Sequence, residues 1–394
     1  MRPDTPEFEK AEPIAPPVRT AVIGPVAANV AFVMELTLLP LLLPAIQADF
    51  GLSISSLVWV FNAYGVAVAI GVFLGGWCGD AFNVRKIFGY GVALFALGSL
   101  VVALADGFDM LIFGRILQGL GGGIFSPLVP LLLTRASPHR PGRALIFWGS
   151  ISGYVAAFAP IIYGSFLGQQ NWNIAFILIA IGALVALTVQ SGKEHSTKNL
   201  WRPRGLSAYL EVFRSRNLLL TFLYVFCTYG AITYFLFQLP VRLSANEITA
   251  GSLGLVLSIL WLTFSGLSTL LRNLVDRDHI RVIMLAAPLL IAAGLPLSFG
   301  SENLSLLVLS TMLVGSGLAC SNAPSTQMIL RFAPKGMRGV STSLDITFAR
   351  LGGIATVAVL AGTERGGAAF AVAALSALAL YSAFIVSKPY NHKA

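Results

Sequence analysis

Four ionisable side chains lie within long apolar runs of this 394-residue sequence, where a charge is costly to keep. Glu35 lies near the middle of the first run, Arg115 in the fourth, and Asp345 and Arg350 in the eleventh. Burial favours the protonated form of a carboxyl group, whereas a nearby arginine favours the ionised form. A glutamate that alternates between an arginine and a wet cavity could therefore bind and release a proton.

Glu35 is the carboxylate at mid-depth and is our first candidate for proton coupling or substrate binding. The alternative is a permanent structural ion pair. Asp345 lies only a turn or two inside its run, so it is either a second proton carrier or a water-facing side chain. Arg350, five residues deeper, is a candidate for lining a cavity and anchoring an anionic substrate. All four histidines fall outside the apolar runs, so any carried proton needs a carboxylate.

The composition requires lipid around these residues. The chain is 56% hydrophobic and 11% charged, whereas soluble domains carry about a quarter charged residues. We expect the three cysteines to pack in apolar surroundings, with no disulfide. We find no metal-ligand set and no cofactor motif.

Twelve runs are long enough to cross the hydrocarbon as helices of about 20 residues. They lie at 21–46, 55–77, 86–105, 109–134, 143–167, 173–190, 217–241, 250–271, 280–299, 303–329, 338–361 and 366–387. The predicted fold is an all-α membrane protein of twelve transmembrane helices in two six-helix bundles. The predicted parts are a tail (1–20), the first bundle (21–190), a linker (191–216), the second bundle (217–387) and a tail (388–394).

Basic residues predict the orientation. With twelve spans, 22 of the 26 Lys and Arg residues fall on the side of the termini, and cytoplasmic segments are enriched in such residues. The sequence therefore predicts both termini in the cytoplasm of an inner-membrane protein. The same distribution explains the net charge of +9 without nucleic acid.

Residues 76–86 read GWCGDAFNVRK. This segment resembles the loop motif after the second helix of the major facilitator superfamily, keeping Gly76, Asp80 and Arg85. The residue after Asp80 is not the usual basic one. Asn83 replaces the usual glycine, and we expect it to adopt the left-handed backbone of a tight turn.

Further segments resemble motifs of the drug:proton antiporters in this superfamily. Residues 115–119 read RILQG, like the antiporters' fourth-helix motif, and Glu35 stands where aspartate is more usual in the first helix. Pro160 and Gly164 keep part of the fifth-helix exporter signature. Residues 338–353 resemble the penultimate helix of fourteen-helix antiporters.

The resemblance implies alternating access by a monomer. It places Glu35 and Arg115 in the same half, as partners. It also implies that Asp80 and Arg85 latch a gate, to which the motif residues Gly76 and Pro160 would belong.

Aromatic residues, among them Tyr163 and Tyr234, could line a cavity for bulky amphipathic substrates. The favoured function is secondary transport of a small molecule, as proton-coupled export of a drug-like or amphipathic metabolite, including a siderophore. The alternative is an importer or facilitator of a small organic anion. A membrane enzyme and a non-transporting sensor are remote alternatives, because no acyl-transfer or nucleotide motif and no soluble domain is found.

Overall fold

The structure is a computed structural model. It describes residues 20–136, 141–168, 171–189, 212–244, 249–275, 279–300, 303–334 and 337–387. Within these ranges the regular structure is helical, as predicted. The predicted tails and most of the predicted linker lie outside the described residues.

The helices follow one another with short connections. They are α1 (Thr20–Asp49), α2 (Ile54–Ala81), α3 (Val84–Ala103), α4 (Phe108–Phe125), α5 (Leu128–Ala136), α6 (Pro141–Phe166), α7 (Trp172–Val189), α9 (Arg216–Ser244), α10 (Ala250–Val275), α11 (Ile280–Gly300), α12 (Leu304–Phe332), α13 (Arg338–Leu360) and α14 (Arg365–Val386).

Length and composition qualify eleven segments of the described chain as membrane spans. One of them, Phe108–Ala136, joins α4 and α5, which are separated by a turn at Ser126 and Pro127. The predicted span at 143–167 coincides with α6, a helix of 26 residues that lies outside these eleven. The prediction of an all-α membrane protein is confirmed.

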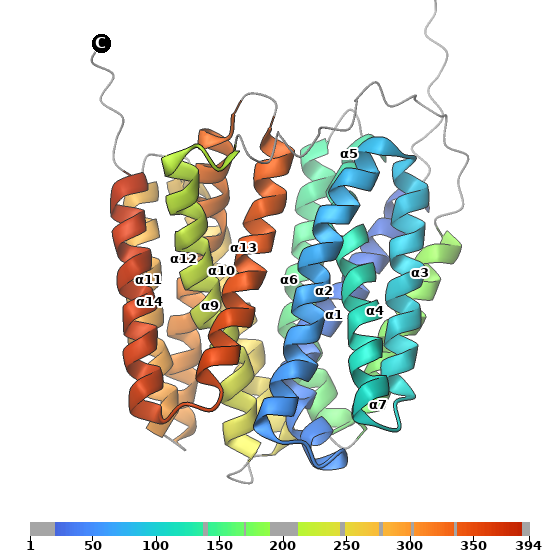
Figure 1. The fold of residues 1–394 in the computed structure, drawn as a ribbon, viewed down its shortest axis with the longest axis horizontal. Coiled ribbons are helices and arrows are strands. Elements are labelled where there is room, and N and C mark those ends of the chain that lie inside the picture. The colour runs from blue at the N-terminus through green and yellow to red at the C-terminus, as the bar shows by residue number, and fades with distance from the viewer. Residues whose placement is uncertain are drawn as a thin grey trace, which may run out of the picture.

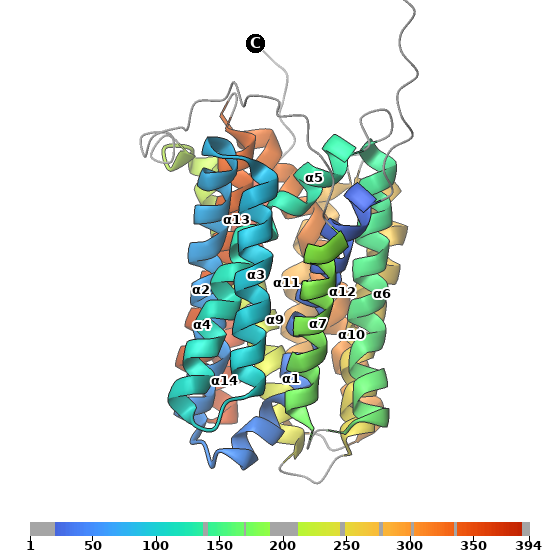
Figure 2. The ribbon, with the colours of Figure 1, turned by 90° about the vertical axis from the view of Figure 1, so that its right-hand side faces the viewer.

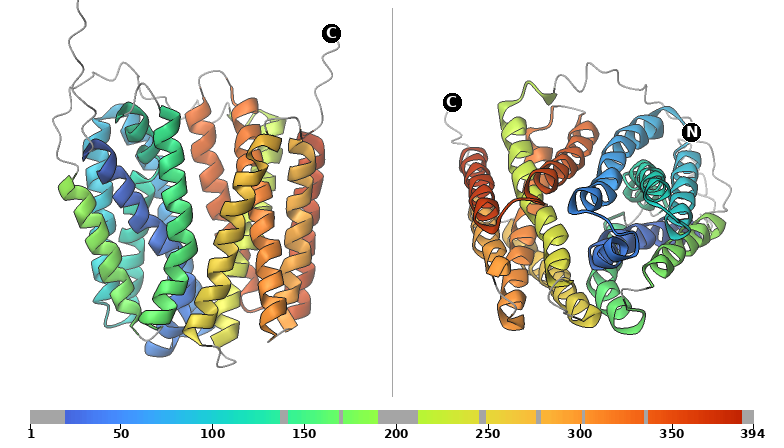
Figure 3. Two further views of the ribbon diagram at one scale, coloured as in Figure 1. Left: turned by 180° about the vertical axis from the view of Figure 1, so that it is seen from behind. Right: turned by 60° about the horizontal axis from the view of Figure 1, so that its bottom comes forward.

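The helices form two groups, α1–α7 and α9–α14, that stand side by side (Figure 1). Figure 2 brings the first group to the front, and the tilted view in Figure 3 shows both groups from their lower end. Helix α1 begins and α14 ends at the upper end in Figure 1, which we call the terminal face. The lower end is the opposite face.

Glycine allows α2 and α4 to approach closely within the first group. A Cβ atom at Gly71 would lie 2.5 Å from the backbone oxygen of Leu120 and 2.9 Å from Cα of Gly123. In lipid no hydrophobic force drives helices together, so such backbone contact supplies the packing energy. This contact fixes α2 beside α4, which carries Arg115.

Three contacts join the two groups on the side of the opposite face. The rings of Phe61 in α2 and Phe237 in α9 meet edge to face at 5.5 Å between centroids. Asn62 Nδ2 donates to the backbone oxygen of Ile354 in α13 at 3.1 Å. Pro160 in α6 lies against Gly254 in α10. We call these three contacts the closing layer.

The turn between α2 and α3 differs from the expectation. Asn83 has φ −65° and ψ 112°, so its backbone is extended, and the prediction of a left-handed backbone there is wrong. Its side chain instead accepts a hydrogen bond from the backbone N–H of Lys86. Asparagine is favoured here because it caps the free amides at the start of α3.

We predict that Gly254→Ala destabilises the closed arrangement. The new Cβ would overlap the backbone oxygen of Pro160, and such overpacking costs about 1–3 kcal/mol. Thermal unfolding in detergent should show a lower Tm. Gly266→Ala is the matched control on the same helix, because no atom lies within 4 Å of its Cβ position. Equal Tm values for the two variants would contradict the close contact.

Candidate functional site

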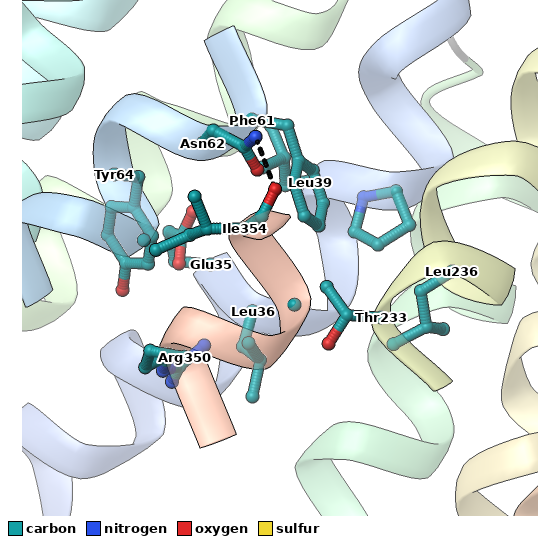
Figure 4. A pocket seen from close by; sticks show the side chains of 13 residues that line it. Glu35, Leu36, Leu39, Phe61, Asn62, Tyr64, Thr233, Leu236, Arg350 and Ile354 are labelled. Atoms are coloured by element: carbon teal, nitrogen blue, oxygen red, sulfur yellow. Dashed lines mark hydrogen bonds between the residues drawn. The ribbon is translucent and has the colours of Figure 1, made fainter. Parts of the chain in front are cut away.

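A cavity of about 60 Å³ lies between the two groups, at the level where α1, α2, α9 and α13 meet. This is room for a few water molecules. Thirteen residues line it, and Figure 4 shows their side chains. Glu35, Tyr64 and Arg350 occupy one side of that view, whereas Thr233 and Leu236 occupy the other. Three residues of the closing layer, Phe61, Asn62 and Ile354, also line the cavity.

The central polar contact is an ion pair between α1 and α4. Arg115 Nη1 donates to Glu35 Oε1 at 2.6 Å, and the two side chains are 0% and 1% exposed. Glu35 lines the cavity, whereas Arg115 lies behind it. The prediction that these two residues are partners is therefore confirmed in geometry, while their role in transport stays a prediction.

A hydrogen-bond network holds Arg115 independently of Glu35. Its Nε donates to the backbone oxygen of Val60 at 3.1 Å, and Nη1 also donates to Gln118 Oε1 at 2.6 Å. Gln118 Nε2 donates to Ser99 Oγ. The guanidinium lies over the ring of Tyr64, 4.3 Å from its centroid, which is a favourable cation–π distance. Arg115 is thus tied to α2 and, through Gln118, to α3.

Several buried polar atoms beside the cavity have no hydrogen-bond partner. They are Glu35 Oε2, Asn62 Oδ1 and the Tyr64 hydroxyl. A buried polar group without a partner costs free energy, so such atoms require water or a ligand. Their position on the cavity wall makes this cavity the candidate binding site.

The second half contributes Arg350 from α13. It lines the cavity, is partly exposed, and lies about halfway along its helix. Its side chain therefore reaches the same space as Glu35. The structure brings together three of the predicted site residues, Glu35, Arg115 and Arg350.

Asp345 lies elsewhere. It accepts a long hydrogen bond from Thr326 Oγ1 at 3.4 Å and is not among the cavity-lining residues. Nearby, the Tyr229 hydroxyl donates to Asn322 Oδ1 at 2.7 Å. Asp345 thus lies outside the cavity lining, and its proton-carrying role stays a prediction.

The two predicted tyrosines do not reach the cavity in this conformation. The Tyr163 hydroxyl donates to the backbone oxygen of Asn171 and accepts from the amide of Ala175, so it ties α6 to the start of α7. Tyr234 is buried, and its hydroxyl donates to the backbone oxygen of Leu360. Both contacts are structural, and substrate binding by either residue stays a prediction.

The predicted gate residues fall at two levels. Pro160 lies in the closing layer. Gly76 is nearer the terminal face, where a Cβ atom would lie 3.5 Å from Ser343 Oγ of α13. The side chain of Asp80 lies outside what the structure describes, and Arg85 is partly buried at the start of α3.

Asn62, Tyr64 and Thr233 are site residues that we did not single out from the sequence. Each is polar within an apolar run, which is a usable signal, but many other Ser and Thr side chains in these helices share it. Gln118 could have been found more directly, because it lies three residues after Arg115 on the same helical face.

Among the described residues, no group of three His, Cys, Asp or Glu side chains could hold a metal ion. The site consists of the Glu35–Arg115 ion pair and the unpaired guanidinium of Arg350 around a small cavity between apolar helices. The chain belongs to the major facilitator superfamily, whose sequence pattern matches residues 26–357, and it is therefore a membrane transporter rather than an enzyme.

Related chains include exporters. The multidrug export protein EmrB of Haemophilus influenzae is 34% identical over 157 residues, which cover 39% of this chain and 31% of that protein. The tetracenomycin C resistance and export protein of Streptomyces glaucescens is 32% identical over 157 residues, covering 39% and 29%. The matched segment spans about a third of each relative's length.

Solved structures share the fold. A D-xylose–proton symporter superposes with a TM-score of 0.77 at 15% identity, covering 94% of this chain and 97% of that one. The nucleoside transporter NupG (D323A mutant) gives 0.75 at 12% identity, covering 93% and 98%. At this identity the likeness concerns the fold alone.

We predict that Arg115→Gln lowers the free energy of unfolding by about 3–5 kcal/mol, because it leaves Glu35 buried and uncompensated. The double variant Glu35→Gln/Arg115→Gln should lose less than the sum of the single variants, since neither charge remains. Denaturant unfolding in detergent measures both. Arg331→Gln, at an exposed position, is the matched control and should change stability by no more than about 0.5 kcal/mol. Additive losses would contradict a coupled pair.

Proposed function

We propose that this chain is a proton-coupled exporter of small amphipathic molecules that works by alternating access. The observation that carries the proposal is the buried ion pair that Glu35, on the wall of a cavity between the two halves, forms with Arg115 behind it. We further propose that it functions as a monomer in a bacterial inner membrane, with the terminal face in the cytoplasm.

Glu35 suits a proton carrier because one side of it faces the cavity. Its Oε1 is engaged by Arg115, whereas its buried Oε2 has no partner. Protonation would neutralise Glu35 and weaken the ion pair. Arg115 would still keep Val60, Gln118 and the Tyr64 ring as partners, so releasing Glu35 does not leave the arginine without contacts.

The contacts between the halves suit a two-state gate. The closing layer lies between the cavity and the opposite face, and its Pro160–Gly254 contact depends on the absence of a side chain. Rocking of one half against the other about a central site is the usual mechanism of such folds. Separation of these surfaces would open the cavity to the opposite face. Gly76, Asp80 and Arg85 would form the gate at the terminal face.

One observation favours export, and another favours an amphipathic substrate. The related chains that match by sequence are named for multidrug or tetracenomycin C export. The cavity wall combines charged side chains with Leu36, Leu39 and Phe61, a surface suited to amphipathic molecules.

We predict that Glu35→Gln abolishes substrate-dependent proton flux, because an amide cannot carry the proton. Purified protein would be reconstituted in liposomes under a pH gradient. Proton flux would be recorded with a pH-sensitive dye on addition of a cationic dye, a neutral antibiotic or an aromatic carboxylate. Asp109→Asn, an exposed carboxylate at the start of α4, is the matched control and should behave as wild type.

Unchanged flux in Glu35→Gln would show that Glu35 does not couple protons, and Asp345→Asn would then be measured. Substrate movement by the wild type without any proton flux would replace the antiporter proposal by a facilitator.

A further inference from the structure

Arg350 faces the cavity without a counter-ion. Among the described residues its guanidinium forms no hydrogen bond and no ion pair, although it lies halfway along a membrane helix. Arg115, by contrast, has a carboxylate, an amide, a backbone oxygen and an aromatic ring as partners. An arginine inside a membrane protein normally pairs or faces a water-filled cavity. The charge of Arg350 is therefore available to pair with a molecule that binds in the cavity.

The charges around the cavity sum to a positive value in either protonation state. Glu35 and Arg115 cancel when Glu35 is ionised, and Arg350 leaves a charge of +1. When Glu35 is protonated, the two arginines give +2. Asp345, on the same helix as Arg350, does not line the cavity and accepts a hydrogen bond from Thr326. The net charge of Glu35, Arg115 and Arg350 therefore repels a cation and attracts an anion in both states.

The rest of the wall suits a molecule with one charged end. The buried Tyr64 hydroxyl has no partner, and the Thr233 side chain lines the cavity from α9. The buried Asn62 Oδ1 lacks a donor. The apolar lining consists of Leu36, Leu39, Pro40, Phe61, Leu236 and Ile354. Figure 4 shows Arg350 and Tyr64 on the side of the cavity away from Leu236, so charged and apolar ends can be held apart.

We propose that the substrate is an amphipathic monoanion whose carboxylate binds Arg350 and whose apolar body lies against the Leu39, Phe61 and Leu236 wall. This inference rests on the proposed transport function and adds the charge class of the substrate. A guanidinium binds a carboxylate through two parallel N–H groups, which gives direction as well as charge. The cavity of about 60 Å³ holds the head group, and the body enters as the halves separate.

The test compares molecules that share a body and differ in the charge of the head. One series is 1-naphthaleneacetate, 1-naphthaleneacetamide and 1-naphthaleneethylamine, and the other is nonanoate, nonanamide and nonylamine. Binding to the full chain in detergent at neutral pH would be measured by calorimetry. We expect at least one carboxylate to bind tenfold or more tightly than its amide, and the amines to bind more weakly than the amides.

Three variants locate the effect. Arg350→Gln should bring the affinity for the carboxylate down to that for the amide, and Arg350→Lys should keep part of the preference. Arg331→Gln, at an exposed arginine of α12, is the matched control and should leave the preference for the carboxylate over the amide unchanged. Thermal unfolding would show that each variant is folded.

The proposal is overturned by equal binding of carboxylate and amide, by preference for the amine, by no binding of either carboxylate, or by a preference that survives Arg350→Gln. Binding needs no proton gradient. If Glu35→Gln shows that Glu35 does not couple protons, the binding preference for the carboxylate is unaffected. Likewise, a failure of that binding preference leaves the proton-flux result unaffected.

Discussion

The fully buried guanidinium of Arg115 constrains the first half of the molecule. In a membrane interior a charged side chain is costly unless protein groups pair with it. Glu35 from α1 and Gln118 from its own turn accept hydrogen bonds from Nη1, Val60 from α2 accepts from Nε, and Gln118 in turn donates to Ser99 of α3, while the buried Nη2 has no hydrogen-bond partner. Four helices are therefore joined around one charge. The close backbone contact at Gly71 and Gly123 lets α2 and α4 approach enough for this network to form.

The second half of the molecule adds a positive charge beside this network but no counter-ion for it. Arg350 enters the same cavity from α13, but it finds no carboxylate there, because Glu35 is already engaged by Arg115. The two halves are held together by other contacts, which are apolar or involve backbone atoms, as between Phe61 and Phe237 and between Asn62 and Ile354. Contacts of this kind can separate without leaving a buried charge unpaired, which suits a surface that must open and close. The unpaired charge of Arg350 faces the cavity, where a substrate can bind to it.

Relatives share only part of their length with this chain, and the solved neighbours share its fold at low identity. Function must therefore be argued from the site. Two properties of the site carry different parts of that argument. The position of buried Glu35 on the cavity wall supports proton coupling, while the absence of a counter-ion at Arg350 bears on the charge of the substrate. These properties belong to different halves, so they can be tested separately.

The amino-acid sequence was sufficient to predict the membrane class, the helix positions and the short list of intramembrane charges. Each follows from local composition, because a helix in lipid must be apolar over a fixed length and charges within it are rare. Local patterns failed where the answer depended on neighbours in space. Asn83 turned out to be a helix cap with an extended backbone. Tyr163 and Tyr234 bond backbone oxygens away from the cavity, whereas Asn62 and Tyr64 line it. These points follow from how the helices pack, since the face that a helix turns inward in lipid depends on which helices pack against it.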